Sequence, residues 1–525
     1  MGMMPPLHIP PLGISEKEAR TRFAALQRKL VPLWEHIRRF NDSEQTIVVV
    51  PSMTIEFDLT GVEMQAYEER MLFMLLLLRQ PRARLVYATS QTILPSTLDY
   101  YLSILPGVVT SHAAQRFFNI AVEDRSPRPL TVKLLERPHV CEHIRSLILD
   151  SDRAHLVAYN ETMYERDLAL RLGIPIYGAD PELATLGTKS GGREVFASTG
   201  VSHAIGRENL RSLDDLLNAL REMRDKKSGM TRAIVKLNDS TSGAGGAVIE
   251  LPESHTIGTA GATTLLEQRV RSMTFESSSM MFERFFDSLA EHGGIVEEYI
   301  QGIGFSSPSV QMRITPLGEV EILSTHDQVL GGPTGQSFLG SRFPANRSYG
   351  PLITAEARKV GHRLAELGVL GRFAVDFVVV QDDVGRWQTY AIEINLRKGG
   401  TTHPYLFLQF LTDGEFSEEE GIFRAPSGVE KYYVASDHLE DTLYHAITPQ
   451  HLIDILIRHR LHFDQAKQTG IVVHMLAMIS ENGRFGVVAI DDSPAQAEDL
   501  YNRMQTIVRN EALQAIRAPA IPEPR

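Results

Sequence analysis

The sequence has almost no cysteine and no excess of basic residues. Cys141 is the single cysteine among 525 residues, so no disulfide can form within the chain and a reducing compartment is favoured. The 53 lysines and arginines are outnumbered by 65 aspartates and glutamates, which gives a net charge of −12. A chain of this charge is poorly suited to neutralise the phosphates of a nucleic acid, so we expect no nucleic-acid partner.

Long apolar runs are also missing. The longest, from Met71 to Leu78, has eight residues. That is less than half of the roughly 20 that a helix needs to cross a membrane. The opening residues, MGMMPPLHIPPLG, lack the basic and apolar regions of a signal peptide. We therefore expect a cytoplasmic protein without a membrane partner.

Several common nucleotide-binding and catalytic patterns are absent as well. No glycine fingerprint follows the first expected strand, Thr46 to Val50, which argues against a dinucleotide site there. The glycine-rich stretch from Asn238 to Gly246 lacks the Gly-Lys-Ser/Thr of a P-loop. No Ser-His-Asp or Cys-His constellation indicates covalent catalysis.

The chain is long enough for two to four domains. Short strands alternate with helical patterns, one of them from Ser111 to Val122, over about the first 180 residues, which predicts a parallel α/β layer. Later segments include a long loop from Asp327 to Tyr349 and a hairpin that turns at Asn482-Gly483. The predicted class is multidomain α/β and α+β, with three units: an N-terminal α/β domain (1–180), a two-lobed core (181–430, divided at about 300) and a small C-terminal α+β domain (431–525).

The stretch from Gly371 to Pro404 carries the densest set of candidate functional residues. Two apolar runs flank a polar, glycine-containing segment, which is the pattern of a β-hairpin. With the turn centred in that segment, Asp376 and Glu393 stand opposite each other, and Asn395 shares the face of Glu393. Two facing carboxylates repel, so a cation is needed. Asp, Glu and Asn oxygens are ligands that Mg²⁺ takes together with phosphates.

A hairpin with one solvated, charged face is the alternative interpretation of the same pattern. The tail RKGGTTHP, residues 397–404, favours the functional one, because two cations, a glycine pair and two hydroxyls suit an anion. Arg372 lies on the face of Asp376, and Arg397 on the face of Glu393.

The loop from Asn238 to Gly246 offers consecutive backbone amides that can close over a polyphosphate. A plain surface hairpin remains the alternative. Lys236 on the preceding strand and Lys189 before a helix can each supply a positive charge to a nucleotide. The strand end from Glu297 to Ile300 can hydrogen-bond an adenine edge through its backbone, with an exposed edge strand as the alternative.

The order of these parts resembles the ATP-grasp superfamily: a lysine, a second lysine with a glycine lid, a Glu-Glu-Tyr-Ile hinge, an Asp strand and a Glu-x-Asn strand. The resemblance implies ATP held between two lobes, with two Mg²⁺ ions, or Mn²⁺ in their place, bridging the phosphates. Three further segments are similar to the carboxylate–amine ligases typified by the peptide ligase of pheganomycin biosynthesis: GADPELATLGTKSGGREVF, STHDQVLGGPTGQSFLGSRFP and EINLRKGGTTHP.

The resemblance also implies a role for each matching residue. The metal ligands are Asp376, Glu393 and Asn395, and Arg397 with the glycines after it steadies the transferred phosphoryl group and the acyl substrate. Apart from the resemblance, Arg372 is a further candidate catalytic residue, because a guanidinium group can bind a carboxylate or a phosphate through two hydrogen bonds. Ribose contacts fall to Glu297 or Glu298, because Gln301 to Ser309 contains no acidic residue. The nucleotide-binding residues implied are Lys189, Lys236, Ser240, Ser242, Gly243, Gly245, Gly246, Glu297, Glu298, Tyr299 and Ile300.

An ATP-dependent ligase is the predicted function. A carboxylate attacks the γ-phosphorus to form an acyl phosphate, and an amine then displaces phosphate to give an amide. A small-molecule kinase on the same scaffold and a nucleotide-binding protein without turnover are the alternatives. Small-molecule or peptide carboxylates and amines are the expected partners, and a homodimer is one assembly compatible with the sequence. The predicted substrate-binding residues are Arg313, His326, Arg342, Gly400, Thr401 and His403.

Overall fold

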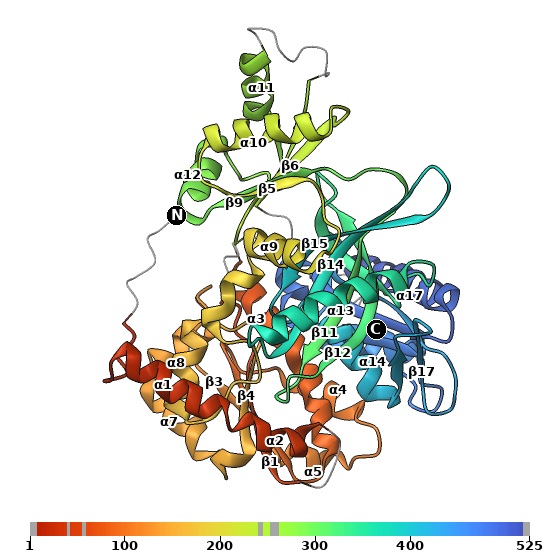
Figure 1. Ribbon diagram of the computed structural model, residues 1–525. Helices are drawn as coiled ribbons and strands as arrows, with labels where there is room; N and C mark the ends of the chain where they lie inside the picture. Colours follow the sequence, from red (N-terminus) through yellow and green to blue (C-terminus); the bar gives the residue numbers. More distant parts are fainter. Residues whose placement is uncertain (1–7, 39–42, 55–58, 240–244, 253–261, 518–525) are drawn as a thin grey trace.

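The structure is a computed structural model that describes all residues except 1–7, 39–42, 55–58, 240–244, 253–261 and 518–525 (Figure 1). The described residues form a four-stranded, a five-stranded and a nine-stranded sheet and a two-stranded ribbon. In Figure 1 the red-to-orange N-terminal unit lies beside the blue C-terminal segment, and the lobe that carries the five-stranded sheet stands above them. The predicted mixed α/β and α+β class is confirmed. No helix in this described part is long and apolar enough to cross a membrane.

The N-terminal unit is a parallel α/β layer. Its elements are α1 (Glu16–Gln27), α2 (Leu30–Ile37), β1 (Gln45–Val50), α3 (Gly61–Glu69), η1 (Arg70–Arg79), β2 (Ala83–Thr89), α4 (Pro95–Ser103), α5 (Thr110–Ala114), β3 (Phe117–Ala121), α6 (Leu130–Leu135), α7 (Pro138–Ser146), η2 (Ser151–Arg153), β4 (Ala154–Ala158) and α8 (Met163–Leu172). The strand order is β3-β2-β1-β4, and every pair is parallel. β1 and β4 are buried throughout, because helices cover both faces of the sheet.

The predicted helix from Ser111 to Val122 is wrong. α5 ends at Ala114, and β3 then pairs with β2 as the edge strand of the parallel sheet. The conformation of a short apolar segment depends on its neighbours in the fold. Here hydrogen bonding to the free edge of β2 favours a strand more than the weak helical pattern favours a helix.

The eight-residue apolar run lies in η1, between the N-terminal sheet and the C-terminal segment. Seven of its residues, all except Leu77, are buried, and they share one hydrophobic core with α14 (Thr402–Thr412) and β19 (Gly470–His474). The run therefore joins two units that are far apart in sequence.

The upper lobe in Figure 1 contains an antiparallel sheet. This lid lobe and the segment that leads into it contain η3 (Pro181–Gly187), α9 (Lys189–Thr199), β5 (Gly206–Leu210), α10 (Leu213–Lys226), β6 (Arg232–Leu237), β7 (Gly246–Glu250), α11 (Ala262–Arg271), β8 (Thr274–Phe275), α12 (Phe282–His292) and β9 (Gly294–Glu298). The strand order is β5-β9-β6-β7-β8. α10, α11 and α12 pack on this sheet through a core of their own.

The nine-stranded sheet forms the centre of the molecule. Its first part contains β10 (Ile303–Ser306), β11 (Pro308–Ile314), β12 (Val320–Gly331), β13 (Ser337–Phe343), α13 (Gly350–Glu366), β14 (Gly371–Gln381) and β15 (Trp387–Asn395). The predicted loop from Asp327 to Tyr349 is wrong, because β12 and β13 pair through it with Asp327 opposite Arg342. Gly332 and Gly335, both with positive φ, close the turn between the strands.

The ribbon of β16 (Glu415–Ser417) and β17 (Ile422–Arg424) leads into the C-terminal segment, whose strands extend the central sheet. The elements of this segment are β18 (Tyr432–Glu440), η5 (Thr442–Ala446), α15 (Pro449–Arg458), β19, η6 (Leu476–Met478), α16 (Ile479–Asn482), β20 (Arg484–Asp491) and α17 (Pro494–Arg517). β18 pairs with β13, and β20 and β19 follow in antiparallel order. The predicted two-residue turn at Asn482-Gly483 is wrong: η6 and α16 connect the strands, and Gly483 ends α16 with a φ of 63°.

Glu276 fastens the lid lobe to the central sheet. This side chain is 5% exposed and directly follows β8. It accepts hydrogen bonds from the Thr334 N–H at 2.8 Å and the Ser337 N–H at 3.1 Å, and from both hydroxyl groups of the same residues. A carboxylate that receives four donors from one turn holds that turn in place.

We predict that Glu276→Ala loosens the contact between the two lobes. The amide groups of Thr334 and Ser337 should exchange hydrogen faster by roughly tenfold or more, since each loses a bond to a charged acceptor. Hydrogen–deuterium exchange measures this directly. Glu267→Ala, which removes only a surface pair with Arg271, is the control and should leave both amides unchanged.

Glu69 makes the stability of the protein depend on pH. The side chain is 1% exposed, its Oε2 accepts a hydrogen bond from the Ala477 N–H, and its Oε1 has no partner among the described residues. Burial raises the pKa of this carboxyl to about 7. Because the folded state holds the proton more tightly than the unfolded state, this contribution is complete below about pH 4.5 and is lost as the pH rises through about 7.

We predict that Glu69→Gln, which cannot ionise, reduces the loss of stability between about pH 5 and about pH 8 by on the order of 2 kcal/mol. Denaturant unfolding at both pH values tests this. Parallel pH profiles for the variant and the wild type would contradict it.

Candidate active site

The hairpin of β14 and β15 has the register that the sequence predicts. Asp376 pairs directly with Glu393, and Ala374 pairs with Asn395. A bulge follows at Ile392, because Phe377 pairs with Ala391 and leaves Ile392 without a partner in the ladder. A bulge changes the direction of neighbouring side chains, and as a result Ile392 and Glu393 both line the same pocket.

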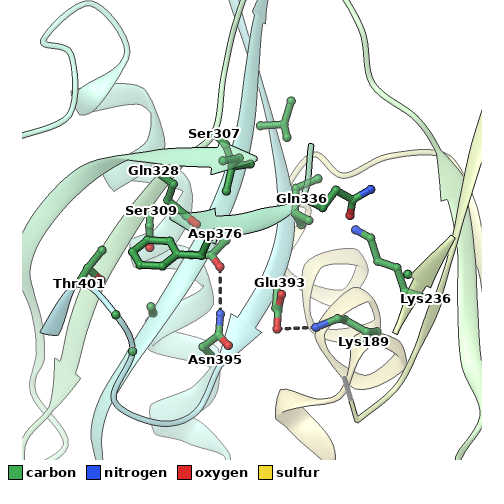
Figure 2. Close-up of a pocket in the computed structure, with 18 of the residues that line it drawn as sticks. Lys189, Lys236, Ser307, Ser309, Gln328, Gln336, Asp376, Glu393, Asn395 and Thr401 are labelled. Atoms are coloured by element: carbon green, nitrogen blue, oxygen red, sulfur yellow. Dashed lines mark hydrogen bonds and ion pairs between the residues drawn. The ribbon is translucent and has the colours of Figure 1, made fainter. Parts of the chain in front are cut away.

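The two carboxylates are held in different states by their neighbours. Burial, and then the charge of Glu393, raise the pKa of Asp376 to about 6. Burial acts on Glu393 in the same direction, but the charge and hydrogen bond of Lys189 outweigh it and lower the pKa of Glu393. The Lys189 Nζ lies 2.5 Å from the Glu393 Oε1, and the Asn395 amide donates to the Asp376 Oδ2 at 3.0 Å (Figure 2). Lys189 thus supplies positive charge to the pair, while the metal ion expected from the sequence stays a prediction.

Lys236 approaches from the lid lobe and is positioned by a buried ion pair. Figure 2 shows Lys236 beside Gln336, on the same side of the pocket as Lys189. Its Nζ lies 2.5 Å from the Glu297 Oε1, and the Arg193 Nη1 lies 3.1 Å from the Glu297 Oε2. Glu297 is only 2% exposed, so its carboxylate is fixed in place and holds the ammonium group of Lys236 at the pocket.

One pocket, here called the central pocket, lies between the lid lobe, the central sheet and the N-terminal unit. It brings together most of the residues predicted from sequence, although their roles stay predictions. The predicted residues that line it are Lys189, Lys236, Gly246, Glu297, Glu298, Tyr299, Ile300, Asp376, Glu393, Asn395, Arg397, Gly400 and Thr401.

Comparison with known proteins identifies the family. An L-propargylglycine–L-glutamate ligase of Streptantibioticus cattleyicolor is 31% identical over 443 residues, covering 83% of this chain and 87% of that protein. The family model described as IQCH-like, ATP-grasp matches residues 181–263 and 260–419. The chain belongs to the ATP-grasp family. The predictions of this family and of a carbon–nitrogen ligase are confirmed.

Other comparisons give more distant similarities. The IQ motif-containing protein H of Danio rerio is 23% identical over 421 residues, which are 71% of this chain and 39% of that protein. A model of the PGM1 C-terminal domain matches residues 451–504. Among solved structures, the biotin carboxylase of Campylobacter jejuni has a TM-score of 0.53 at 12% identity, covering 91% of this chain and 96% of that one. A biotin carboxylase domain from Hydrogenobacter thermophilus has a TM-score of 0.52 at 13% identity, covering 88% and 89%.

Three arginines that were candidates to bind a carboxylate or a phosphate do not line the central pocket. Arg342 pairs with Glu498 at 2.9 Å on the surface, and Arg313 donates to Glu321 at 2.6 Å. Arg372 is opposite Arg313 in the sheet, four residues before Asp376 and thus about 13 Å away from it along the strand. Burial and the charge of Arg313 lower the pKa of Arg372 to about 10.

The two predicted histidines also lie outside the pocket. His326 is fully buried, its Nε2 lies 2.6 Å from the Tyr433 hydroxyl, and burial lowers its pKa to about 3. His403 lies 3.2 Å from His474, measured between the two Nε2 atoms, and burial together with this neighbour lowers its pKa well below the usual value. Neither side chain is placed to take a proton from a molecule in the pocket.

Part of the predicted phosphate lid cannot be placed. Ser240, Ser242 and Gly243 lie outside the described residues. Gly245 does not line the pocket, and its carbonyl accepts a hydrogen bond from the Leu237 N–H at 3.0 Å, which closes the base of the lid hairpin.

Sequence reasoning missed several polar residues of the pocket. Ser309 and Gln311 on β11 face it, with Ser309 opposite Asp376. The alternation of polar and apolar residues in PSVQMRI is the signal that could have found them. Arg70, Tyr159 and Asp437 carry no such signal, since they are far apart in the sequence and meet only in the folded chain. They line the end of the pocket beyond Arg397, together with Tyr67, Met53 and His438.

The oxygen donors of the hairpin fit a magnesium ion. Two carboxylates and one amide are hard ligands, and Mg²⁺ commonly uses only one or two protein carboxylates beside phosphates and water. Within the described residues, no cluster of three or more His, Cys, Asp or Glu side chains forms a metal site by itself. The arrangement therefore suits an ion that is shared with a nucleotide.

We predict that Glu297→Gln weakens ADP binding in the presence of magnesium by roughly tenfold, because Lys236 loses the buried carboxylate that holds it toward the pocket. Isothermal titration calorimetry measures the dissociation constant. Glu222→Gln, which removes the exposed pair with Arg207 in the same lobe, is the control. Equal ADP affinity in Glu297→Gln and wild type would show that Glu297 does not position Lys236.

Proposed function

We propose that this ATP-grasp ligase joins the carboxylate of one amino acid to the amine of another through an acyl phosphate. The observation that carries the proposal is the shared pocket: a hinge, two lysines and the Asp376–Glu393 pair line the same space as Arg397 and Thr401. A nucleotide and an acyl substrate held in that space have their reacting groups side by side.

The hinge end suits an adenine ring. Apolar side chains of Ile234, Ile300, Leu330 and Val378 line it, and they come from both lobes. An aromatic base packs well against such walls while the hinge backbone reads its edge. We propose that Tyr299 and Ile300 form this hinge.

The metal end suits the phosphates. Asp376, Glu393 and Asn395 would hold two Mg²⁺ ions, for which Mn²⁺ can substitute, and these ions neutralise negative charge on the phosphates. Lys189 has to exchange its pairing with Glu393 for a phosphate oxygen when the nucleotide binds. Lys236, held by Glu297, keeps its position throughout.

Arg397 would orient the acyl substrate. A substrate carboxylate attacks the γ-phosphorus of ATP, the bond from that phosphorus to the bridging oxygen breaks, and ADP leaves. The amine of the second substrate then attacks the acyl carbon and inorganic phosphate leaves, while the amine loses a proton. Positioning and charge neutralisation supply most of the rate enhancement, so no side-chain nucleophile is required.

The substrate class follows from the relative that acts on L-propargylglycine and L-glutamate. At 31% identity the two chains need not share the same pair, so we propose L-amino acids as the class. We also propose a cytoplasmic location, because the single thiol, Cys141, is buried and reduced.

The test is ADP release from ATP with pairs of L-amino acids, followed by mass spectrometry of the product. Release that requires both a carboxylate and an amine supports the ligase. With the carboxylate alone, hydroxylamine should yield a hydroxamate by trapping the acyl phosphate. ADP release with a phosphorylated hydroxyl product would instead indicate a kinase.

We predict that Glu393→Gln lowers the turnover number for ADP release by roughly 100-fold or more, the size of effect seen when a group that stabilises transition-state charge is removed. The fold should persist by circular dichroism, because glutamine has nearly the same shape. Near-native turnover in this variant would remove Glu393 from the metal site.

A further inference from the structure

The end of the central pocket beyond Arg397 is formed by two units of the chain, the N-terminal unit and the C-terminal segment. Arg70 begins η1 of the N-terminal unit, Tyr159 follows β4, and Asp437 lies on β18. All three line the pocket, although none comes from the lid lobe or from the hairpin of β14 and β15. A subsite built in this way is available to a substrate other than ATP.

Arg70 has an unused half of its guanidinium group at this place. The side chain is 4% exposed, and its Nη1 lies 3.1 Å from the Asp437 Oδ2. Its Nη2 has no hydrogen-bond partner among the described residues. The guanidinium group lies over the rings of Tyr67 and Tyr159, at 4.7 and 4.9 Å from their centroids, so its direction is fixed. A buried N–H donor without an acceptor is costly, and binding an anion would supply one.

The charges around Arg70 also favour an anion. Asp437 is the acidic residue of this cluster, and it is already shared by Arg70, His438 and Arg484, whose Nε donates to the Asp437 carbonyl at 2.9 Å. Burial alone would raise the pKa of Tyr159, but the positive charges of Arg70 and Arg397 lower it below its usual value. The local field is therefore net positive.

Arg397 connects this end to the reacting groups. Its Nη1 donates to the Tyr159 hydroxyl at 3.4 Å, and its charge also acts on Asp376 and Glu393. The order along the pocket is thus metal-site carboxylates, Arg397, Tyr159 and Arg70. An acyl group beside Arg397 has its amine partner on the Arg70 side.

We propose that Arg70 binds the α-carboxylate of the amine substrate. This inference rests on the proposed function. The carboxylate of the acyl donor is consumed in the reaction, whereas an amino acid that supplies the amine keeps its own carboxylate into the product. The Nη1 of Arg70 is paired with Asp437, whereas its Nη2 has no hydrogen-bond partner among the described residues. The Nη2 can therefore bind this carboxylate and place the substrate amine toward Arg397.

The test compares an amino acid with its neutral analogue. The probes are the amine substrate that gives the fastest ADP release in the pairwise screen and the α-carboxamide of the same amino acid. In the wild type, the change from carboxylate to carboxamide should lower kcat/KM by roughly 30-fold or more, the effect of removing one partner of a buried charged hydrogen bond. Most of this change should appear in the KM of the amine substrate, with the KM of ATP unchanged.

Arg70→Gln should lose this discrimination. Its kcat/KM for the amino acid falls to the value for the carboxamide, so the ratio of the two approaches one. Arg70→Lys keeps the positive charge but loses the planar guanidinium group with its two amino groups, and should show an intermediate ratio. Arg386→Gln, at the exposed turn between β14 and β15, is the control and should keep the wild-type ratio.

A second variant guards against misfolding. Arg70→Gln leaves Asp437 buried without its partner, so Arg70→Gln/Asp437→Asn, which removes both charges, is measured in parallel. If either folded variant discriminates as strongly as the wild type, the assignment of Arg70 is wrong while the ligase function stands. If the wild type releases no ADP with any pair, the proposed function and this inference both fail.

Discussion

Asp376 and Glu393 face each other on neighbouring strands, and the rest of the site is arranged around their repulsion. Direct pairing in the ladder keeps the two carboxylates close, and burial prevents water from screening them. Glu393 is stabilised by Lys189, whereas the pKa of Asp376 stays raised. An additional positive charge near Asp376 would therefore stabilise the pair further. We propose that a divalent cation carried by a nucleotide supplies that charge.

The remaining architecture places four separate parts of the chain around this pair. The lid lobe supplies Lys236, which is oriented by Glu297, and Glu276 fastens this lobe to the turn beside the pocket. The C-terminal strands extend the central sheet, and the apolar segment η1 packs between them and the N-terminal sheet. Because η1 also begins with Arg70, the packing that joins these units is the same packing that positions a pocket residue. On the proposal made for Arg70, stability and substrate recognition are coupled at this junction.

Local patterns predicted the local geometry well. The alternation in two strands was enough to place Asp376 opposite Glu393, and the order of lysines, hinge and acidic strands indicated the family. The failures have physical causes. Part of the segment from Ser111 to Val122, expected to be a helix, forms a strand instead, because it pairs with the edge of the parallel sheet. The strands β12 and β13 were missed because the glycines of the turn between them made the whole segment resemble a loop. The guanidinium groups of Arg313 and Arg372 could bind an anion, but these residues lie too far along their strands from Asp376. The contact between Arg70 and Asp437 joins two units of the chain, and no local sequence pattern encodes such a contact.

The central claim is that these carboxylates hold a divalent ion together with a nucleotide. Electron paramagnetic resonance of Mn²⁺, titrated with and without ADP, measures this most directly, because free and bound Mn²⁺ give different signals. The wild type should bind Mn²⁺ far more tightly when ADP is present, and Asp376→Asn/Glu393→Gln should lose that gain while remaining folded. Equal ADP-dependent Mn²⁺ binding by the double variant and the wild type would contradict the account.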